Sequence, residues 1–206
     1  MPYILRAALV LALGLLAGCA EQNDLSKPPA PFGDFRLGYG IVVADKAESV
    51  GPSRHASADE IETALKTALQ DRLGRYQGDK LYHIGIGVPA YALAVPGVPV
   101  VLSPKSVLVI EVDVWDDTAQ RAINPKSKRF TVFEGMSGST VIGSGLTKTR
   151  EQQLQTLAEN AARLINEWLI ENKAWFSPEA VAARAALTVT APAKPGTAAP
   201  ATPPSN

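Results

Sequence analysis

The chain has 206 residues, and its 20 Lys and Arg balance its 20 Asp and Glu, so the formal net charge at pH 7 is zero. A balanced charge disfavours nucleic acid as a partner, because nucleic-acid-binding proteins carry clustered excess basic residues. Cys19 is the only cysteine. A single cysteine excludes an internal disulfide, and if Cys19 is acylated no thiol remains for a cysteine-based metal site.

The first element is an apolar segment that ends at this cysteine. Arg6 supplies positive charge, residues 7–16 are apolar, and small residues follow, as in a secretory signal peptide. The segment is shorter than the roughly 20 apolar residues that span a bilayer. The sequence Leu16-Ala17-Gly18-Cys19 resembles the lipobox of bacterial lipoproteins. A lone cysteine at this place in a secreted protein is the alternative.

The lipobox resemblance implies that residues 1–18 are removed and that Cys19 carries acyl chains such as palmitate. Several acyl chains would hold the protein stably at its membrane. By the same resemblance, Ala20 rather than aspartate after the cysteine implies the outer membrane, with the protein facing the periplasm.

Composition divides the rest of the chain into four parts. Residues 19–33 contain prolines and are expected to form an extended tether, followed by a single domain over residues 34–176. Ser177-Pro178-Glu179 predicts a short helix or extension over residues 177–190. Residues 191–206 are rich in Pro and Ala and are expected to be disordered.

Two capping boxes mark the starts of the predicted helices. Ser57 with Glu60 begins a helix whose apolar residues recur every four positions. Thr149 with Gln152 begins a longer helix with one broad apolar stripe, which includes Leu157 and Leu164. Each stripe predicts one buried face.

Strands are predicted over residues 35–44, 82–88, 106–115 and 129–134, because apolar residues there alternate or form short runs. The element order is therefore β-α-β-β-β-α. This order favours a two-layer α+β domain, with an antiparallel sheet of about four strands and both amphipathic helices on one face.

Four short motifs in this region resemble those of a group of uncharacterised proteobacterial envelope lipoproteins. The motifs are Ile86-Gly87-Val88-Pro89, Ser103-Pro104-Lys105-Ser106, Val114-Trp115-Asp116-Asp117 and Gly143-Ser144-Gly145-Leu146-Thr147. The resemblance spans most of the predicted domain and implies no active site.

A candidate catalytic motif lies after the last predicted strand. Residues 135–139 approach the G-x-S-x-G elbow of serine hydrolases, with Ser137 as the nucleophile and His83 or His55 as the base. The fifth position is serine, however, and no helix begins there, so a flexible loop is favoured. No catalytic residue is assigned, and a serine hydrolase is kept as an alternative.

Two further clusters are candidate binding sites. Gly143, Ser144 and Gly145 with Thr149 at the start of the last long helix form a possible weak anion site, although their spacing fails the Walker pattern. Carboxylates at positions 111, 113, 116 and 117 are read as a solvated strand face rather than a metal site. No cofactor or metal is expected.

The segment from Val88 to Pro104 has no charged residue, and prolines interrupt it. We expect it to be a surface that contacts a partner, because an exposed apolar loop is unfavourable unless something covers it. The possible contact residues are Tyr91, Leu93, Val95, Val98 and Val100. The alternative is that the segment folds back onto the sheet and completes the core.

The functional prediction is a lipid-anchored envelope protein without catalytic activity. It would bind another envelope protein in an assembly, transport-accessory or scaffold role. A periplasmic carrier of a lipid or small molecule is a further alternative, and it requires a closed apolar cavity of about 300 Å³ or more.

Overall fold

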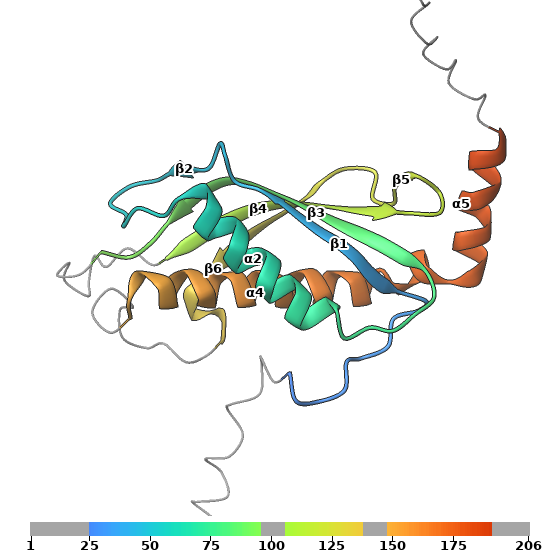
Figure 1. Cartoon of the computed structure of the whole chain (residues 1–206), viewed down its shortest axis with the longest axis horizontal. Coiled ribbons are helices and arrows are strands. Elements are labelled where there is room, and N and C mark those ends of the chain that lie inside the picture. The colour runs from blue at the N-terminus through green and yellow to red at the C-terminus, as the bar shows by residue number, and fades with distance from the viewer. Residues whose placement is uncertain (1–24, 96–105, 138–147, 191–206) are drawn as a thin grey trace, which may run out of the picture.

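The computed structural model describes residues 25–95, 106–137 and 148–190 (Figure 1). Its elements in chain order are β1 (Arg36–Val43), β2 (Glu48–Ser49), α2 (Ala58–Leu73), β3 (Leu81–Ala92), β4 (Val107–Asp116), β5 (Arg121–Ala122), β6 (Lys128–Phe133), the 3-10 helix η3 (Glu134–Ser137), α4 (Arg150–Glu171), the 3-10 helix η4 (Lys173–Phe176) and α5 (Pro178–Thr190).

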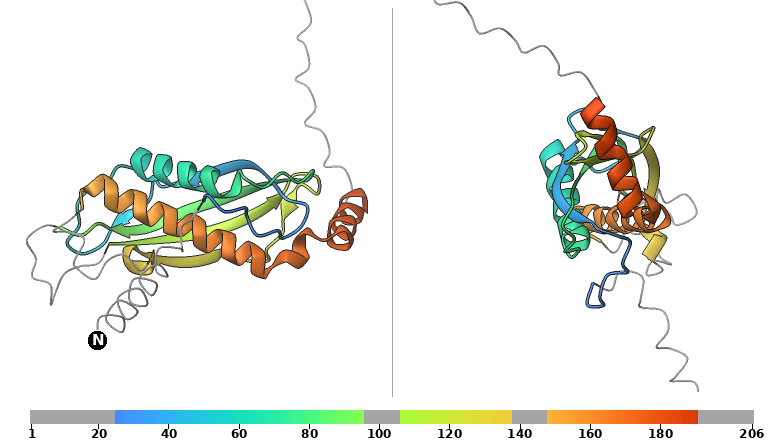
Figure 2. Two further views of the ribbon diagram at one scale, coloured as in Figure 1. Left: turned by 90° about the horizontal axis from the view of Figure 1, so that it is seen from below. Right: turned by 90° about the vertical axis from the view of Figure 1, so that its right-hand side faces the viewer.

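The strands form one six-stranded sheet that α2 and α4 cover on a single face. The sheet order is β1-β3-β4-β5, with β2 paired to β3 and β6 paired to β4. Figure 2 shows α2 and α4 side by side against the same face of this sheet. The predicted two-layer α+β class is therefore confirmed, and the four predicted strands are the four long strands of the sheet.

The sheet is mixed, which corrects the prediction that it is antiparallel throughout. β1 and β2 run parallel to β3, whereas β4 pairs antiparallel with both β3 and β6. The reason lies in α2, which connects β1 to β3. A helix that carries the chain back along the sheet allows the next strand to start at the same end as the previous one.

Both helices begin at the predicted capping boxes. In α2 the Ser57 hydroxyl accepts from the Glu60 backbone N–H, and the Glu60 carboxylate accepts from the Ser57 N–H. Thr149 and Gln152 make the same reciprocal pair at the start of α4. Each pair satisfies two backbone donors that a helix start leaves free.

The core lies between the helices and the sheet. Strand β3 buries Tyr82, Ile84, Ile86 and Val88, and β4 buries the four alternate residues from Leu108 to Val114. This alternation matches the predicted period of two. The helices contribute residues such as Leu65 and Leu157, which are fully buried.

Phe32 corrects the predicted boundary between tether and domain. It is 2% exposed and packs its ring 4.5–5.1 Å from the rings of Phe35, Tyr76 and Phe176. Aromatic rings at such centroid distances stabilise each other beyond simple burial. The domain therefore begins a few residues earlier than composition alone indicated.

The short predicted helix after residue 177 is present as α5, at one end of the sheet (Figure 1). Arg184 joins it to the body, because its Nε donates to Asp116 Oδ2 at 2.8 Å. Among the described residues, none of the helices is long and apolar enough to cross a membrane.

Candidate protein-interaction surface

Several predicted site residues lie outside the described residues. They are Cys19, Val98, Val100, Gly143, Ser144 and Gly145. The lipidation site and the glycines of the possible anion site therefore stay sequence predictions.

The structure places Tyr91 and Leu93 in the core, which corrects their assignment as partner contacts. They are 3% and 0% exposed. The Tyr91 hydroxyl also donates to the Ala56 carbonyl at 3.0 Å and accepts from the Ala56 N–H at 3.1 Å. The physical reason is that β3 continues to Ala92, so this part of the segment pairs with β4 instead of forming a loop. Val95 is half-buried.

Thr149, the described member of the possible anion site, is the N-cap of α4. Its hydroxyl accepts from the Gln152 N–H at 3.2 Å, and its own N–H donates to Gln152 Oε1 at 2.9 Å. These bonds use the backbone N–H groups of Thr149 and Gln152, which are donors that an anion at this helix start would need. The capping box explains Thr149 without a ligand.

His83, the first candidate base for Ser137, is held elsewhere. Its Nδ1 accepts from the Tyr39 N–H at 2.9 Å, and its Nε2 lies 3.0 Å from Asp117 Oδ1. Since Nδ1 is an acceptor, the proton of the neutral ring lies on Nε2, which donates to Asp117. Both ring nitrogens are thus used, while His55 is exposed in the loop before α2.

The four weighed carboxylates have partners in the protein. Asp113 accepts from Asn124 and Ser127, and Asp117 from His83. Glu111 lies 3.7 Å from Arg129 Nη1. Asp116 is 3% exposed and pairs with Arg184. Within the described part of the chain, no group of three or more His, Cys, Asp or Glu is placed to hold a metal ion.

The face of the sheet opposite the helices carries exposed apolar side chains on β1. Tyr39, Ile41 and Val43 are 71%, 54% and 52% exposed. They share one face of the strand, because side chains in a strand alternate. Trp115 on β4 and Phe133 on β6 are also exposed, at 40% and 43%. We call Tyr39, Ile41 and Val43 the β1 stripe.

Beside the β1 stripe no side chains project from the outer face of β3, because glycines occupy those positions. Ile41 pairs with Gly85 and Val43 with Gly87, and on the other side these glycines pair with Asp113 and Glu111. A Cβ added at Gly85 would meet no atom nearer than 3.9 Å. The outer face therefore has exposed apolar side chains along β1, glycines along β3 and carboxylates along β4.

Residue patterns did not identify the β1 stripe in advance. Ile41-Val42-Val43 is a continuous apolar run, which is typical of a strand buried on both faces. In the structure only Val42 points to the core, at 3% exposed. The signal that was present is the spacing of Tyr39, Ile41 and Val43 at every second position.

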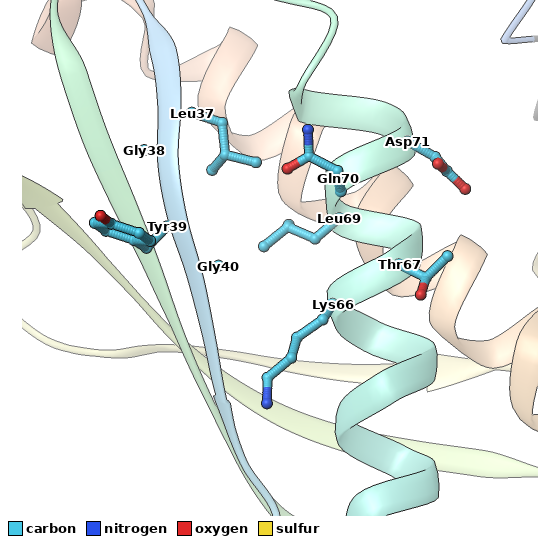
Figure 3. Close-up of a pocket in the computed structure, with 9 residues that line it drawn as sticks. All are labelled: Leu37, Gly38, Tyr39, Gly40, Lys66, Thr67, Leu69, Gln70 and Asp71. Carbon is cyan, nitrogen blue, oxygen red and sulfur yellow. The ribbon is translucent and has the colours of Figure 1, made fainter.

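A surface groove of about 440 Å³ runs between β1 and α2 (Figure 3). Its strand wall is Leu37–Gly40, and residues of α2 from Lys66 to Asp71 form the other wall. Gly40 makes the close approach possible, because a Cβ there would lie 2.7 Å from Leu69 Cδ2. We call this the β1–α2 groove.

A second groove of about 570 Å³ lies between α2 and α4 and is bordered by carboxylates. Several of them are in the first turns of the helices, where negative charge complements the helix dipole. Arg150 crosses this groove, with bonds of 2.6 and 2.8 Å to the two Glu60 oxygens. This pairing, with the Ser57 backbone, lowers the pKa of Glu60 from 4.5 to about 2. Both grooves open to the surface, so neither is the closed cavity that a carrier requires.

Comparison with known proteins assigns no family. No family model matches the sequence, and no curated protein matches it. A provisionally assigned lipoprotein from Caulobacter crescentus is 17% identical, with a TM-score of 0.40 over 71% of this chain and 95% of that one.

Two other solved structures align less well. A protein of family DUF330 from Xanthomonas campestris is 14% identical, with a TM-score of 0.38 over 70% of this chain and 90% of that one. The PelC dodecamer of Paraburkholderia phytofirmans is 12% identical, with a TM-score of 0.34 over 64% of this chain and 88% of that one. Likeness at this level carries no argument about function.

Proposed function

We propose that this protein is a lipid-anchored protein of the bacterial cell envelope that binds another envelope protein without catalysis. The single observation that carries the binding role is the β1 stripe, in which Tyr39, Ile41 and Val43 are each more than half exposed. Contiguous exposed apolar surface on a soluble domain is unfavourable and is typical of protein interaction sites. The anchor is supported by Leu16-Ala17-Gly18-Cys19.

The anchor has a direct test. Cells that express the full chain are grown with radiolabelled palmitate, and the protein is recovered from separated inner and outer membranes. The parent should carry label and fractionate with the outer membrane. Cys19→Ala should lose the label, because no other cysteine is present. Label that survives this substitution would contradict the lipobox assignment, and recovery with inner-membrane markers would contradict the outer-membrane location.

The binding role is tested with the double variant Tyr39→Ser, Ile41→Ser. It should keep the thermal midpoint of the parent, since both side chains are exposed, and it should lose partners that crosslink to the native lipoprotein in cells. The matched control is Leu187→Ser, which alters an exposed apolar residue on α5. If the double variant retains every crosslinked partner, the β1 stripe is not the binding surface.

A further inference from the structure

β1 is the terminal strand of the sheet in the described part of the chain. It pairs with β3, and no other strand pairs with it there. Alternate backbone N–H and C=O groups of a terminal strand point away from the sheet and are free to pair with another strand. Proteins usually protect such edges with charged residues or proline. Leu37–Val43 has neither.

One protective feature is present, and it leaves most of the edge open. The pairing of β1 with β3 shifts register between Leu37 and Gly40. At this shift the Tyr39 N–H turns toward β3, where it donates to His83 Nδ1. From Gly40 to Val43 the pairing with β3 is regular. The outward backbone groups of that stretch therefore keep the spacing that a further strand needs.

The β1–α2 groove adds room at the start of this edge, because its strand wall, Leu37–Gly40, meets the regular stretch at Gly40. Figure 3 shows Leu69 and Gln70 on α2 beside Leu37 and Gly40 on β1. The volume of about 440 Å³ lies within the usual range for ligand sites, about 300–1,000 Å³. Side chains of an added strand that point to the helix side would enter this groove. Side chains on the other face would extend the β1 stripe.

We propose that the β1–α2 groove accepts an extended segment of a partner protein, with β-branched or aromatic residues at alternate positions, which adds to the free edge of β1 as a further strand. This inference rests on the proposed function and names the chemistry of its partner. Backbone hydrogen bonds supply the affinity in such strand addition, and side chains at alternate positions supply the specificity. Opposite Tyr39, Ile41 and Val43, the favoured cross-strand partners are β-branched or aromatic residues.

The size of the groove favours a partner segment over a second copy of this chain. If two copies joined edge to edge through β1, each would bring its own α2 to the same side of the joined sheet. α2 has 16 residues, and a helix of that length fills roughly 1,900 Å³. The groove offers about 440 Å³. A single extended strand needs no helix in this space.

The test uses a fluorescein-labelled heptapeptide of alternating threonine and valine and the purified full chain in detergent. The control peptide has the same sequence with N-methyl groups on alternate amides, which removes the donors on one edge. Binding is followed by fluorescence anisotropy. The unmodified peptide should bind saturably, and methylation should weaken it by about tenfold or more because several backbone hydrogen bonds are lost.

Two variants on one helix test the place of binding. Gln70→Trp fills the β1–α2 groove and should weaken peptide binding by about tenfold or more. Thr63→Trp is equally exposed on α2, lines only the second groove, and should change binding by no more than about twofold. Equal thermal midpoints confirm that both variants fold.

Four results with the purified protein would overturn strand addition. They are no binding of the unmodified peptide, equal binding of both peptides, equal binding to Gln70→Trp and the parent, and a dimer of the full chain that Gln70→Trp dissociates. The last would mean that a second copy occupies the edge. Loss of crosslinked partners in Tyr39→Ser, Ile41→Ser but not in Gln70→Trp would overturn strand addition alone. Peptide binding without any crosslinked partner of the parent would overturn the proposed function alone.

Discussion

Gly38 has less room for a side chain than Gly85 and Gly87, the glycines of β3 on the outer face. An added Cβ would lie 2.5 Å from both Cε1 and Nδ1 of His83, whose ring is held by Tyr39 and Asp117. We therefore expect Gly38→Ala to lower the free energy of unfolding by about 1–3 kcal/mol, the usual cost of overpacking. Urea unfolding followed by circular dichroism measures the change.

Gly85 provides the matched control for Gly38, because it lies on the neighbouring strand with open space above it. Gly85→Ala should leave stability unchanged or raise it by up to about 1 kcal/mol, since alanine loses less backbone entropy on folding. Equal destabilisation by the two substitutions would mean that the position of the His83 ring is not the cause.

Glu60 should make stability depend on pH. Its pKa is about 2 in the folded protein against an ordinary 4.5, chiefly because Arg150 donates to its carboxylate. A lowered folded-state pKa contributes stability that is complete above pH 4.5 and is lost as the pH falls toward 2. Glu60→Gln should therefore lose less stability than the parent across that window. Thermal midpoints at a series of pH values measure this.

The control for the pH experiment is Glu48→Gln, at an exposed carboxylate in β2. It should leave the slope of midpoint against pH close to that of the parent. Arg150→Gln should reduce the slope as Glu60→Gln does, because both remove the same pair. If Glu60→Gln and the parent lose stability equally between pH 4.5 and 2, the pair does not control acid sensitivity.

At the scale of elements, α4 supplies the largest apolar stripe. Leu157 is fully buried, whereas Leu164 is half-buried at the margin of the stripe. Leu157→Ala should reduce the free energy of unfolding by about 2–5 kcal/mol, and Leu164→Ala by about half as much, because the cost follows the apolar area lost. The two substitutions thus differ where sequence alone made them equal. Equal costs in urea unfolding would contradict the burial of α4.

Element types and starts were predictable because they rest on local rules. The capping boxes at Ser57 and Thr149 and the alternation along β3 need only neighbouring residues. Buried polar residues were not predictable in the same way. Asn160 on α4 is fully buried and donates to the carbonyls of Phe133 and Glu134, which are more than 20 residues away. Its role depends on which element packs beside the helix.

At the scale of the whole molecule, the position of β1 decides where the proposed partner would bind. Local patterns place Tyr39, Ile41 and Val43 in a strand but do not say whether that strand is central or at an edge. The direction of the α2 crossover makes β1 parallel to β3, and within the described residues no strand pairs with its other side. Tyr91 is a core residue because β3 continues to Ala92, and Leu93 is buried directly after that strand. The proposed interaction surface could therefore not be predicted from the sequence, whereas the fold class could.

A buried ion pair links α5 to the sheet, so truncations before and after α5 should differ in their effect on stability. The Asp116 and Arg184 side chains are 4% and 13% exposed, and Arg184 also reaches the Tyr82 hydroxyl at 3.4 Å. Removing one partner of a buried pair costs about 3–5 kcal/mol, because the other charge stays buried. Ending the chain after Ser177 should therefore lower the unfolding free energy by about 3 kcal/mol or more.

Ending the chain after Thr190 should leave the unfolding free energy unchanged, because residues 191–206 are rich in Pro and Ala and have little apolar surface to bury. Arg184→Leu should reproduce most of the loss caused by the shorter truncation. Adding Asp116→Asn to Arg184→Leu should restore part of it, since an amide costs less to bury than a carboxylate. Urea unfolding of the four variants measures these differences. A truncation after Ser177 that unfolds at the parent's midpoint would show that α5 contributes nothing to the fold.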